Sequence, residues 1–367
     1  MRVAHFVPVL DQAGTYGGPS GVCELLCDEL AARGHRVDVI GVCPRDALPW
    51  RPAVGRLWAL HVTTGFRIAG RRHPGAVFSF RLLWWFGRTH RRLDLVHLHG
   101  MREPMSVALM LLCVLTRTPF VAQAHGMLES PTVVPVWDPF CSAVLRRACV
   151  VLALTEDEVQ VVAHQRRCTS VELLPNPAPA SCTPATRGDY VLCCARLHPR
   201  KRVGLFVQMA RLVIATRPHV QFVVVGPPEG DEGAVVEAVS AHPGNFRWVP
   251  GVPTQEARRW IAEAGILVVT AEREPFGMTI VEALSSGTPV LGTSDLALSA
   301  ALAEAGAMRV VPADAEALAA ELELLLDDGV AVAAQVFRGS RWVADNASVG
   351  AVVDRLESVY DGGLVRS

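Results

Sequence analysis

Short apolar runs recur along the chain, and each is followed by a polar or glycine-containing turn and a helix-like pattern. Such runs are typical of parallel strands that are buried on both faces. The pattern therefore predicts an α/β protein with parallel sheets. The expected strands cover residues 3–9, 37–42, 94–99, 119–124, 149–155, 171–174, 190–195, 220–225, 246–249 and 266–271.

This alternation is interrupted once, near the middle of the chain. The segment Pro175-Asn176-Pro177 and the stretch 178–189 contain Pro, Ser, Thr and Gly and show no apolar periodicity. Such a composition is typical of a break between domains. The 367 residues are enough for two domains. We therefore predict a first domain over 1–177, a linker over 178–189 and a second domain that starts at 190.

The most informative stretch follows the expected strand 266–271. It begins with an acidic turn that contains Glu274, and a helical pattern with Glu282 comes next. Turns at this position lie at the carboxyl edge of a parallel sheet, where open α/β sheets bind ligands. The first turn of the helix would offer the N–H groups of Gly277, Met278 and Thr279 to an anion. Two carboxylates around such a helix end suit a sugar nucleotide.

The string E-P-F-G-M-T-I-V-E-A, from Glu274 onward, resembles the E-x7-E signature of retaining glycosyltransferases of family 4. The resemblance extends over nearly the whole chain and is loosest between residues 44 and 93. It implies the GT-B fold, in which two Rossmann-like, doubly wound domains face a cleft. It also implies that the second domain runs over 190–345 and that a terminal helix, within 346–367, crosses back to the first domain.

The resemblance also assigns roles to individual residues. Glu274 and His125 would act at the donor sugar, Glu282 would accept hydrogen bonds from the ribose, and Arg196 with Lys201 would hold the diphosphate. We interpret His97 and His99, in the segment D-L-V-H-L-H, as structural. The expected donor-binding residues are Gly17, Gly18, Arg196, Lys201, Gly251, Val252, Phe276, Gly277, Met278, Thr279 and Glu282.

One compositional feature favours the role of Lys201 independently of the resemblance. It is the only lysine among 35 basic residues. An ammonium group on a flexible stem differs from a guanidinium in shape and hydration. A lone lysine between two arginines therefore indicates a requirement that arginine does not meet, whereas the alternative is a chance surface lysine.

Charge is unevenly distributed, although the formal net charge is only −1, which does not indicate a nucleic-acid partner. Residues 47–93 contain no acidic residue but many arginines, interleaved with Trp84, Trp85 and Phe86. The segment 67–92 suits an amphipathic element on anionic lipid. The alternative is a helix that packs on its own domain and exposes its arginines to water. We expect a cytoplasmic protein with peripheral contact at the inner face of the membrane.

The 10 cysteines include no C-x-x-C pair and no spacing that indicates a metal site. Cys23 and Cys27 share one helix face, and we interpret the cysteines as small buried hydrophobes in a reducing cytosol. The sequence also lacks the Asp-x-Asp motif of metal-dependent glycosyltransferases. We therefore expect no metal and no cofactor other than the donor substrate.

The resulting hypothesis is a metal-independent, retaining glycosyltransferase. It would move a sugar from a nucleoside diphosphate sugar to a hydroxyl acceptor, which is either soluble or lipid-linked and anionic. The products would be a polysaccharide, a glycolipid or a small-molecule glycoside. Two alternatives remain at this stage: a sugar-nucleotide epimerase of the same fold, and a non-catalytic donor-binding subunit.

Overall fold

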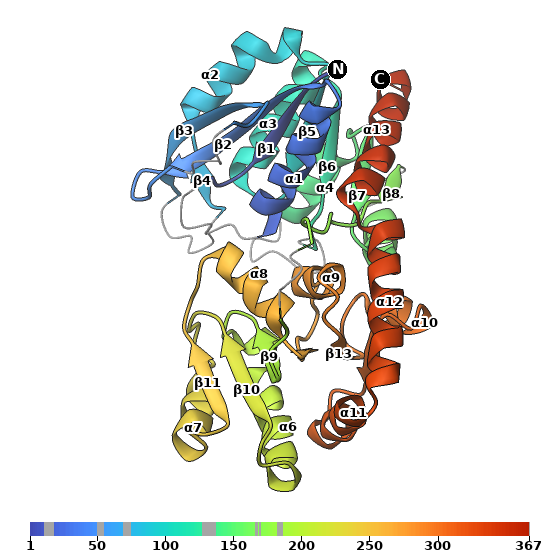
Figure 1. The fold of residues 1–367 in the computed structure, drawn as a ribbon. Coiled ribbons are helices and arrows are strands. Elements are labelled where there is room, and N and C mark those ends of the chain that lie inside the picture. The colour runs from blue at the N-terminus through green and yellow to red at the C-terminus, as the bar shows by residue number, and fades with distance from the viewer. Residues whose placement is uncertain are drawn as a thin grey trace. The chain divides into compact units, whose positions relative to one another are not determined.

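Figure 1 shows the computed structural model, which describes residues 1–10, 18–49, 55–68, 75–126, 137–165, 168, 170–181 and 186–366. The chain forms two compact units. Unit 1 comprises Met1–Pro177 together with Val349–Ser367, and unit 2 comprises Ala178–Ser348. The last helix therefore packs on the first unit, as the resemblance implied.

Unit 1 is built on an eight-stranded sheet with the order β4-β3-β2-β1-β5-β6-β7-β8. All neighbouring strands are parallel except β3 and β4, which are antiparallel. The chain order reverses between β1 and β5, so the topological switch point of this sheet lies there. The strands are β1 Arg2–Val7, β2 Arg36–Pro44, β3 Ala59–Arg67, β4 Val77–Phe78, β5 Leu95–His99, β6 Phe120–Gln123, β7 Val150–Ala153 and β8 Val171–Leu173.

Two layers of helices cover this sheet. Helices α1 and α13 pack together on one face, and α2, α3 and α4 contribute to the apolar core on the other. Alternate strand residues point to opposite faces. The helices of unit 1 are α1 Gly18–Ala32, α2 Phe80–Thr89, η1 His90–Arg92, α3 Pro104–Thr116, α4 Trp137–Leu145, α5 Glu156–Gln160, η2 Val161–Gln165 and α13 Val349–Arg366.

The edge of the sheet formed by β3 and β4 was not predicted. The segment A-L-H-V-T-T-G-F-R of β3 is only half-buried, so it contains neither a continuous apolar run nor a strict alternation. Strand β4 has two residues, which is too short to produce a pattern. The tryptophan-containing helix α2, in contrast, forms where an amphipathic element was expected.

Unit 2 is built on a six-stranded sheet with the order β11-β10-β9-β12-β13-β14, and all of its strands are parallel. Its topological switch point lies between β9 and β12. The strands are β9 Tyr190–Cys194, β10 Gln221–Val225, β11 Phe246–Val249, β12 Ile266–Val269, β13 Val290–Thr293 and β14 Arg309–Val311.

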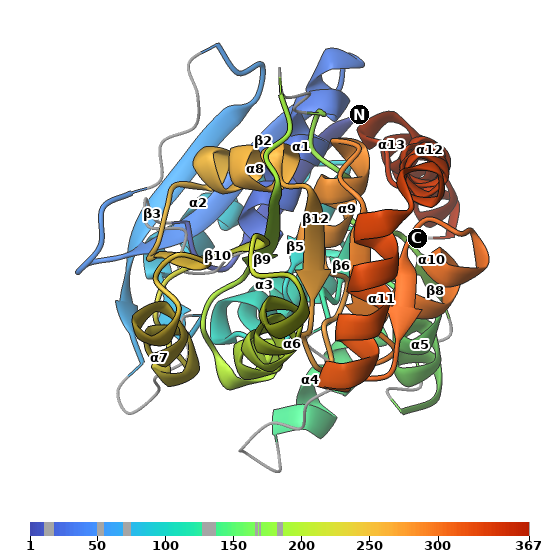
Figure 2. The same ribbon diagram turned by 60° about the horizontal axis from the view of Figure 1, so that its bottom comes forward.

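Figure 2 shows how helices cover both faces of this second sheet. Helices α6, α7 and α11 pack on one face, and α8, α9 and α12 lie on the other. Both units are thus doubly wound, as predicted. The helices of unit 2 are η3 Pro199–Lys201, α6 Val203–Thr216, α7 Gly233–Ala241, α8 Thr254–Glu263, α9 Met278–Ser285, α10 Ser299–Glu304, α11 Ala315–Asp327 and α12 Gly329–Asn346.

Within the part of the chain that the structure describes, no helix combines the length and the apolar character needed to cross a bilayer.

Candidate functional site

The switch point of unit 2 brings together the two loops that the sequence singled out. The segment after β9 carries Arg196 and Lys201, and the segment after β12 carries Glu274 and leads into α9. Because β9 and β12 are adjacent parallel strands, both loops leave the sheet at its carboxyl edge. A small hollow lies between them, and its lining includes Lys201, Thr270, Glu274 and Thr279. Unit 2 therefore has its polar site at the expected position.

Lys201 and Glu274 face each other across this hollow. The Lys201 Nζ donates a charged hydrogen bond to Glu274 Oε2, and the two side chains are 22% and 17% exposed. Partial burial strengthens such a pair relative to one in open solvent. Each charge is thus neutralised by the other.

Hydrogen bonds connect the two loops along their main chains. The Thr270 hydroxyl donates to the Lys201 carbonyl at 2.9 Å, and the Glu272 N–H donates to the Arg200 carbonyl at 2.7 Å. Arg202 has a left-handed backbone with φ of 46°, and its Nε donates to the Thr270 carbonyl at 2.8 Å. The same guanidinium pairs with Asp295 at 2.8 Å. Lys201 is therefore held at the hollow by several contacts beyond its ion pair.

Arg196 lies at the outer side of the same loop. Its Nη1 is 2.8 and 3.0 Å from the two carboxylate oxygens of Glu229, and 64% of its side chain is exposed. The backbone here depends on Gly226, because a Cβ atom at that residue would lie 1.8 Å from the Ala195 carbonyl oxygen. Glycine is thus required directly after β10.

The N-terminus of α9 offers the predicted anion-binding groups. Gly277 has φ of 80°, and the N–H groups of Gly277, Met278 and Thr279 donate to no other described residue. These free N–H groups, together with the helix dipole, favour a bound anion. The Phe276 side chain is buried, so only the main chain of this residue is accessible to a ligand.

Glu282 projects from the next turn of α9 and is largely buried, with 12% of its side chain exposed. Burial raises the pKa of this carboxyl group, and the Arg258 guanidinium, whose Nε is 3.0 Å from Glu282 Oε1, works in the opposite direction. Arg258 comes from α8 and was not predicted as a site residue. The carboxylate therefore has one oriented cation partner and one oxygen left to accept from a ligand.

The remaining predicted glycines have different environments. Gly251 has φ of 69° and follows β11 at the same edge of the sheet, and the half-buried Val252 comes next. Gly18 is the first residue of α1, and a Cβ atom there would meet nothing within 4 Å. Gly17 lies outside the described residues.

In unit 1, His125 is the end of a chain of hydrogen-bonded rings. Its Nε2 is 3.0 Å from His99 Nδ1, and His99 Nε2 is 3.0 Å from His5 Nδ1. His5 Nε2 is 3.3 Å from the Tyr360 hydroxyl, which is 2.7 Å from His97 Nδ1. The three strand histidines point to the same face of the sheet because His5 pairs with His97 and His99 is two residues further.

This chain of rings sets the protonation state and the tautomer of His125. Desolvation lowers the pKa of His125 and of His5 to about 3, so these imidazoles are neutral near neutral pH. A neutral imidazole has one donor and one acceptor, and each link sets the tautomer of the next ring. His125 also bonds to Asn176, and its backbone is left-handed with φ of 50°. His99 therefore holds the His125 ring directly, and His97 joins the same chain of hydrogen bonds through Tyr360 and His5.

The structure thus gathers one set of predicted residues in unit 2 and places His125 in unit 1. Sequence reasoning missed the partners that hold these groups: Glu229, Arg258, His5 and Tyr360. None of them belongs to a recognisable motif, and Tyr360 is more than 200 residues away from every histidine it contacts. The usable signal in the sequence was the spacing of His97 and His99, which lie two residues apart on one strand and therefore point to the same face of the sheet.

Two family models match the chain. The model described as glycosyltransferase family 4 matches residues 16–181, and the model described as glycosyl transferases group 1 matches residues 188–328. A phosphatidyl-myo-inositol mannosyltransferase from Mycolicibacterium smegmatis is 26% identical to this chain over an alignment of 381 positions. The alignment covers 95% of this chain and 92% of that protein.

Solved structures give the same fold. Sucrose-phosphate synthase from Thermosynechococcus elongatus superimposes with a TM-score of 0.73 at 18% identity, over 100% of both chains. Anabaena HepE in complex with UDP superimposes with a TM-score of 0.74 at 15% identity, over 98% of this chain and 100% of that one. The sequence match and the fold agree, and the chain belongs to glycosyltransferase family 4 and is a glycosyltransferase with the GT-B fold.

Proposed function

We propose that this glycosyltransferase uses a nucleoside diphosphate sugar, transfers the sugar with retention of configuration, and does so without a metal ion. The observation that carries the proposal is the hollow at the switch point of unit 2. Lys201, Glu274 and Thr279 line this hollow. Arg196, Glu282 and the free N–H groups of α9 belong to the loop and the helix that flank it and add a cation, a carboxylate and dipoles.

The diphosphate leaving group requires stabilisation as its negative charge develops. Lys201 supplies a compact ammonium, Arg196 a planar guanidinium, and Gly277–Thr279 the N–H donors. Both cations are already paired with carboxylates, namely Glu274 and Glu229. Binding therefore proceeds by exchange, in which phosphate oxygens replace carboxylate oxygens. Glu274 is then free to accept from sugar hydroxyls or to stabilise positive charge at the anomeric carbon.

The role of His125 at the donor sugar comes from the family resemblance. Its imidazole is neutral and already bonded to His99 and Asn176. A sugar hydroxyl would therefore replace Asn176 or bond to the main chain at His125. The fixed ring orientation suits recognition of a hydroxyl better than proton transfer.

The reaction class is tested by measuring donor consumption with and without an acceptor. A transferase consumes the donor only when acceptor is present, and NMR of the product anomeric centre should show the configuration of the donor. Donor conversion that needs no acceptor would favour the epimerase alternative. An inverted product would contradict retention.

The role of Glu282 gives a binding prediction. Glu282→Ala should weaken donor binding by about 1.5–3 kcal/mol, because hydrogen bonds to a charged group are lost. Calorimetry with the nucleoside diphosphate and with its deoxyribose analogue measures this. In the wild type, removal of the ribose hydroxyl should lower the binding free energy by as much as the Glu282→Ala substitution does. In Glu282→Ala, removal of the same hydroxyl should cause no further loss of binding free energy. Equal losses in both proteins would contradict the assignment.

Metal independence gives a second prediction. The initial rate of transfer should be unchanged when Mg²⁺ is omitted and EDTA is added, because cations and N–H groups of the protein take the place of the ion. Complete loss of activity in EDTA that Mg²⁺ or Mn²⁺ restores would contradict it.

The acceptor side of the proposal rests on α2. Phe80 and Trp84 are 69% and 64% exposed on its outer face, and the Arg88 guanidinium lies 4.7 Å from the centroid of the Trp84 ring. No described carboxylate pairs with the exposed arginines of α2 and η1, which are Arg81, Arg88, Arg91 and Arg92. Two other arginines of the basic stretch are already neutralised: Arg56 pairs with Glu24 and Asp28, and Arg67 pairs with Asp46.

This outer face of α2, with its aromatic rings and unpaired cations, suits the interface of an anionic membrane. The mannosyltransferase relative is named for an anionic inositol lipid. We include in the proposal that α2 contacts such a surface and that the acceptor is lipid-linked or anionic.

Vesicle binding tests the contact. Replacement of Arg88 and Arg91 together by Ala should reduce partitioning onto phosphatidylserine vesicles roughly thirtyfold, since each cation near the surface contributes about 1 kcal/mol. Phe337→Ala on α12 is the control, because it removes from unit 2 an aromatic ring that is as exposed as Phe80. This substitution should leave vesicle partitioning unchanged. Unchanged partitioning of the arginine variant would show that α2 is only a solvated helix.

A further inference from the structure

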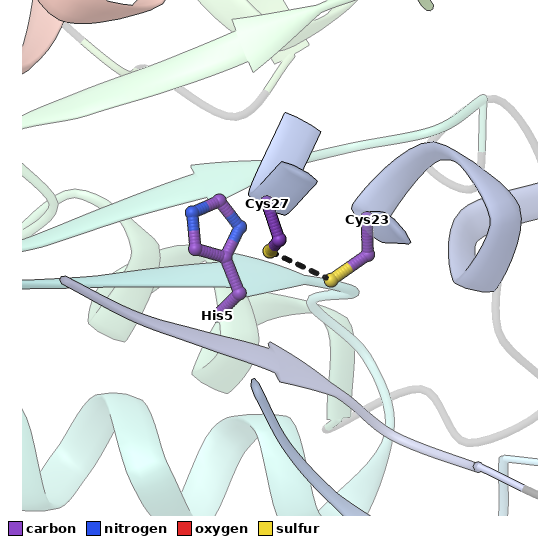
Figure 3. A group of neighbouring side chains, drawn as sticks. All are labelled: His5, Cys23 and Cys27. Carbon is purple, nitrogen blue, oxygen red and sulfur yellow. Dashed lines mark hydrogen bonds between the residues drawn. The ribbon is translucent and has the colours of Figure 1, made fainter. Parts of the chain in front are cut away.

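Three metal-ligating side chains converge inside unit 1, away from the loops described above. Cys23 and Cys27 are one helical turn apart on α1, so they lie on the same face, which is turned toward the sheet. His5 comes from the middle of β1, on the face that α1 covers. Figure 3 shows the two thiols and the imidazole next to one another. All three side chains are at most 1% exposed.

The spacing of the ligand atoms fits a tetrahedral ion. The two sulfur atoms are 3.7 Å apart. Two thiolates bound at about 2.3 Å with a tetrahedral angle between them are separated by about 3.8 Å. The ligand atoms of His5, Cys23 and Cys27 all lie within 4.8 Å of one another. Side-chain shifts of about 1 Å therefore complete the geometry that Zn²⁺ prefers.

The surroundings of His5 provide the second layer of a metal site. Its Nδ1 is 3.0 Å from His99 Nε2, and its Nε2 is 3.3 Å from the Tyr360 hydroxyl. Whichever nitrogen binds the ion, the other keeps a hydrogen-bond partner. Such partners orient ligating histidines and are a usual part of metal sites. The ion replaces the hydrogen-bond partner at the nitrogen that it binds, and a water molecule completes the four ligands.

Charge balance is compatible with this degree of burial. Two thiolates and a neutral imidazole around Zn²⁺ give a complex with no net charge, which avoids the large cost of burying an isolated ion. Binding forms two Zn–S bonds and one Zn–N bond, and the two thiol protons are released to solvent. Mg²⁺ fits poorly because it requires oxygen ligands. The site is thus chemically distinct from one that would assist a diphosphate leaving group.

We propose that His5, Cys23 and Cys27 bind a structural Zn²⁺ that joins β1 to α1. The proposal does not depend on the nucleotide site of unit 2. Because the ligands are enclosed, the ion enters as the chain folds, and a chelator added to the folded protein removes it slowly. The sequence did not indicate this site, since the third ligand lies 18 residues before the first cysteine.

The test uses the full chain refolded under reducing conditions with Zn²⁺ or with Co²⁺ as a spectroscopic probe. After dialysis, the wild type should retain about one zinc per chain, and the cobalt form should show a thiolate-to-cobalt charge-transfer band. Cys23→Ala and Cys27→Ala should each reduce the band, and the double variant should lose both the band and the zinc. Cys113→Ala, at a buried cysteine of α3, is the matched control and should keep both.

Circular dichroism and a cooperative thermal unfolding transition verify that each variant is folded. If the double variant does not fold, X-ray absorption at the zinc edge of the wild type decides instead. Two sulfur neighbours and at least one imidazole nitrogen support the site. Absence of zinc and of a cobalt band in the reduced wild type, or equal binding by the double cysteine variant, would overturn it.

Discussion

Replacement of Lys201 by Ala should reduce transfer by about a hundred- to a thousandfold. Removal of one preorganised donor to a developing negative charge costs this much in comparable sites. The lysine lies at the switch point, where its side chain pairs with Glu274 and its carbonyl accepts a hydrogen bond from the Thr270 hydroxyl. Its loss removes the ammonium from the diphosphate and leaves Glu274 without its partner. Steady-state kinetics should show that kcat falls and that affinity for the nucleoside diphosphate falls with it.

Two further variants make this result specific. Lys201→Arg keeps the charge but changes the shape and the donor geometry, so it should recover only part of the activity. Arg211→Ala removes a half-buried cation of α6 that pairs with Glu237, and it should have no effect on transfer. Full activity of Lys201→Ala would mean that the lone lysine is a chance surface residue.

Replacement of Glu274 by Gln should have a different signature. The Glu274 carboxylate accepts from Lys201 Nζ, so it would compete with a diphosphate for this cation. Its neutralisation should therefore leave binding of the nucleoside diphosphate unchanged or slightly tighter. Transfer should nevertheless fall by about a hundredfold, because the charge that faces the sugar is lost. Lys201→Ala and Glu274→Gln together separate binding of the leaving group from action at the sugar.

Glu272→Gln is the matched control for this second prediction. Glu272 lies in the same loop and is more exposed, and the one described cation that pairs with its carboxylate is its neighbour Arg273. Its neutralisation should leave both binding and transfer intact. A Glu274→Gln protein that transfers at the wild-type rate would show that this carboxylate only holds Lys201 in place.

Much of the fold could be predicted because parallel strands buried on both faces have a plain sequence signature. Strands such as β10 and β12 are continuous apolar runs, and each is followed by a turn and a helix. Strand β3 gave no such signal, since it lies next to the edge of its sheet and is only half-buried. Its pairing with β2 is set by tertiary contacts, which local patterns do not encode.

The site could be predicted in part, for a similar reason. Glu274, Glu282 and Lys201 belong to loops and to a helix whose order along the chain implies the carboxyl edge of the sheet. Their partners could not be predicted, because Arg258 and Glu229 reach the site only through the packing of other elements. The alignment of His5 with His97 likewise depends on strand register, which the sequence did not reveal.

Thermal unfolding with UDP, GDP, ADP and dTDP, with and without Mg²⁺, tests the central claim most directly. A ligand at a hundred times its Kd adds about 2.7 kcal/mol of stability. For a unit of this size, each kcal/mol corresponds to about 2–4 °C in Tm. We predict that one nucleotide raises Tm selectively, that Mg²⁺ does not change the rise, and that Lys201→Ala loses it. No rise with any nucleotide, or a rise that depends on Mg²⁺ and survives in Lys201→Ala, would contradict the proposed diphosphate site.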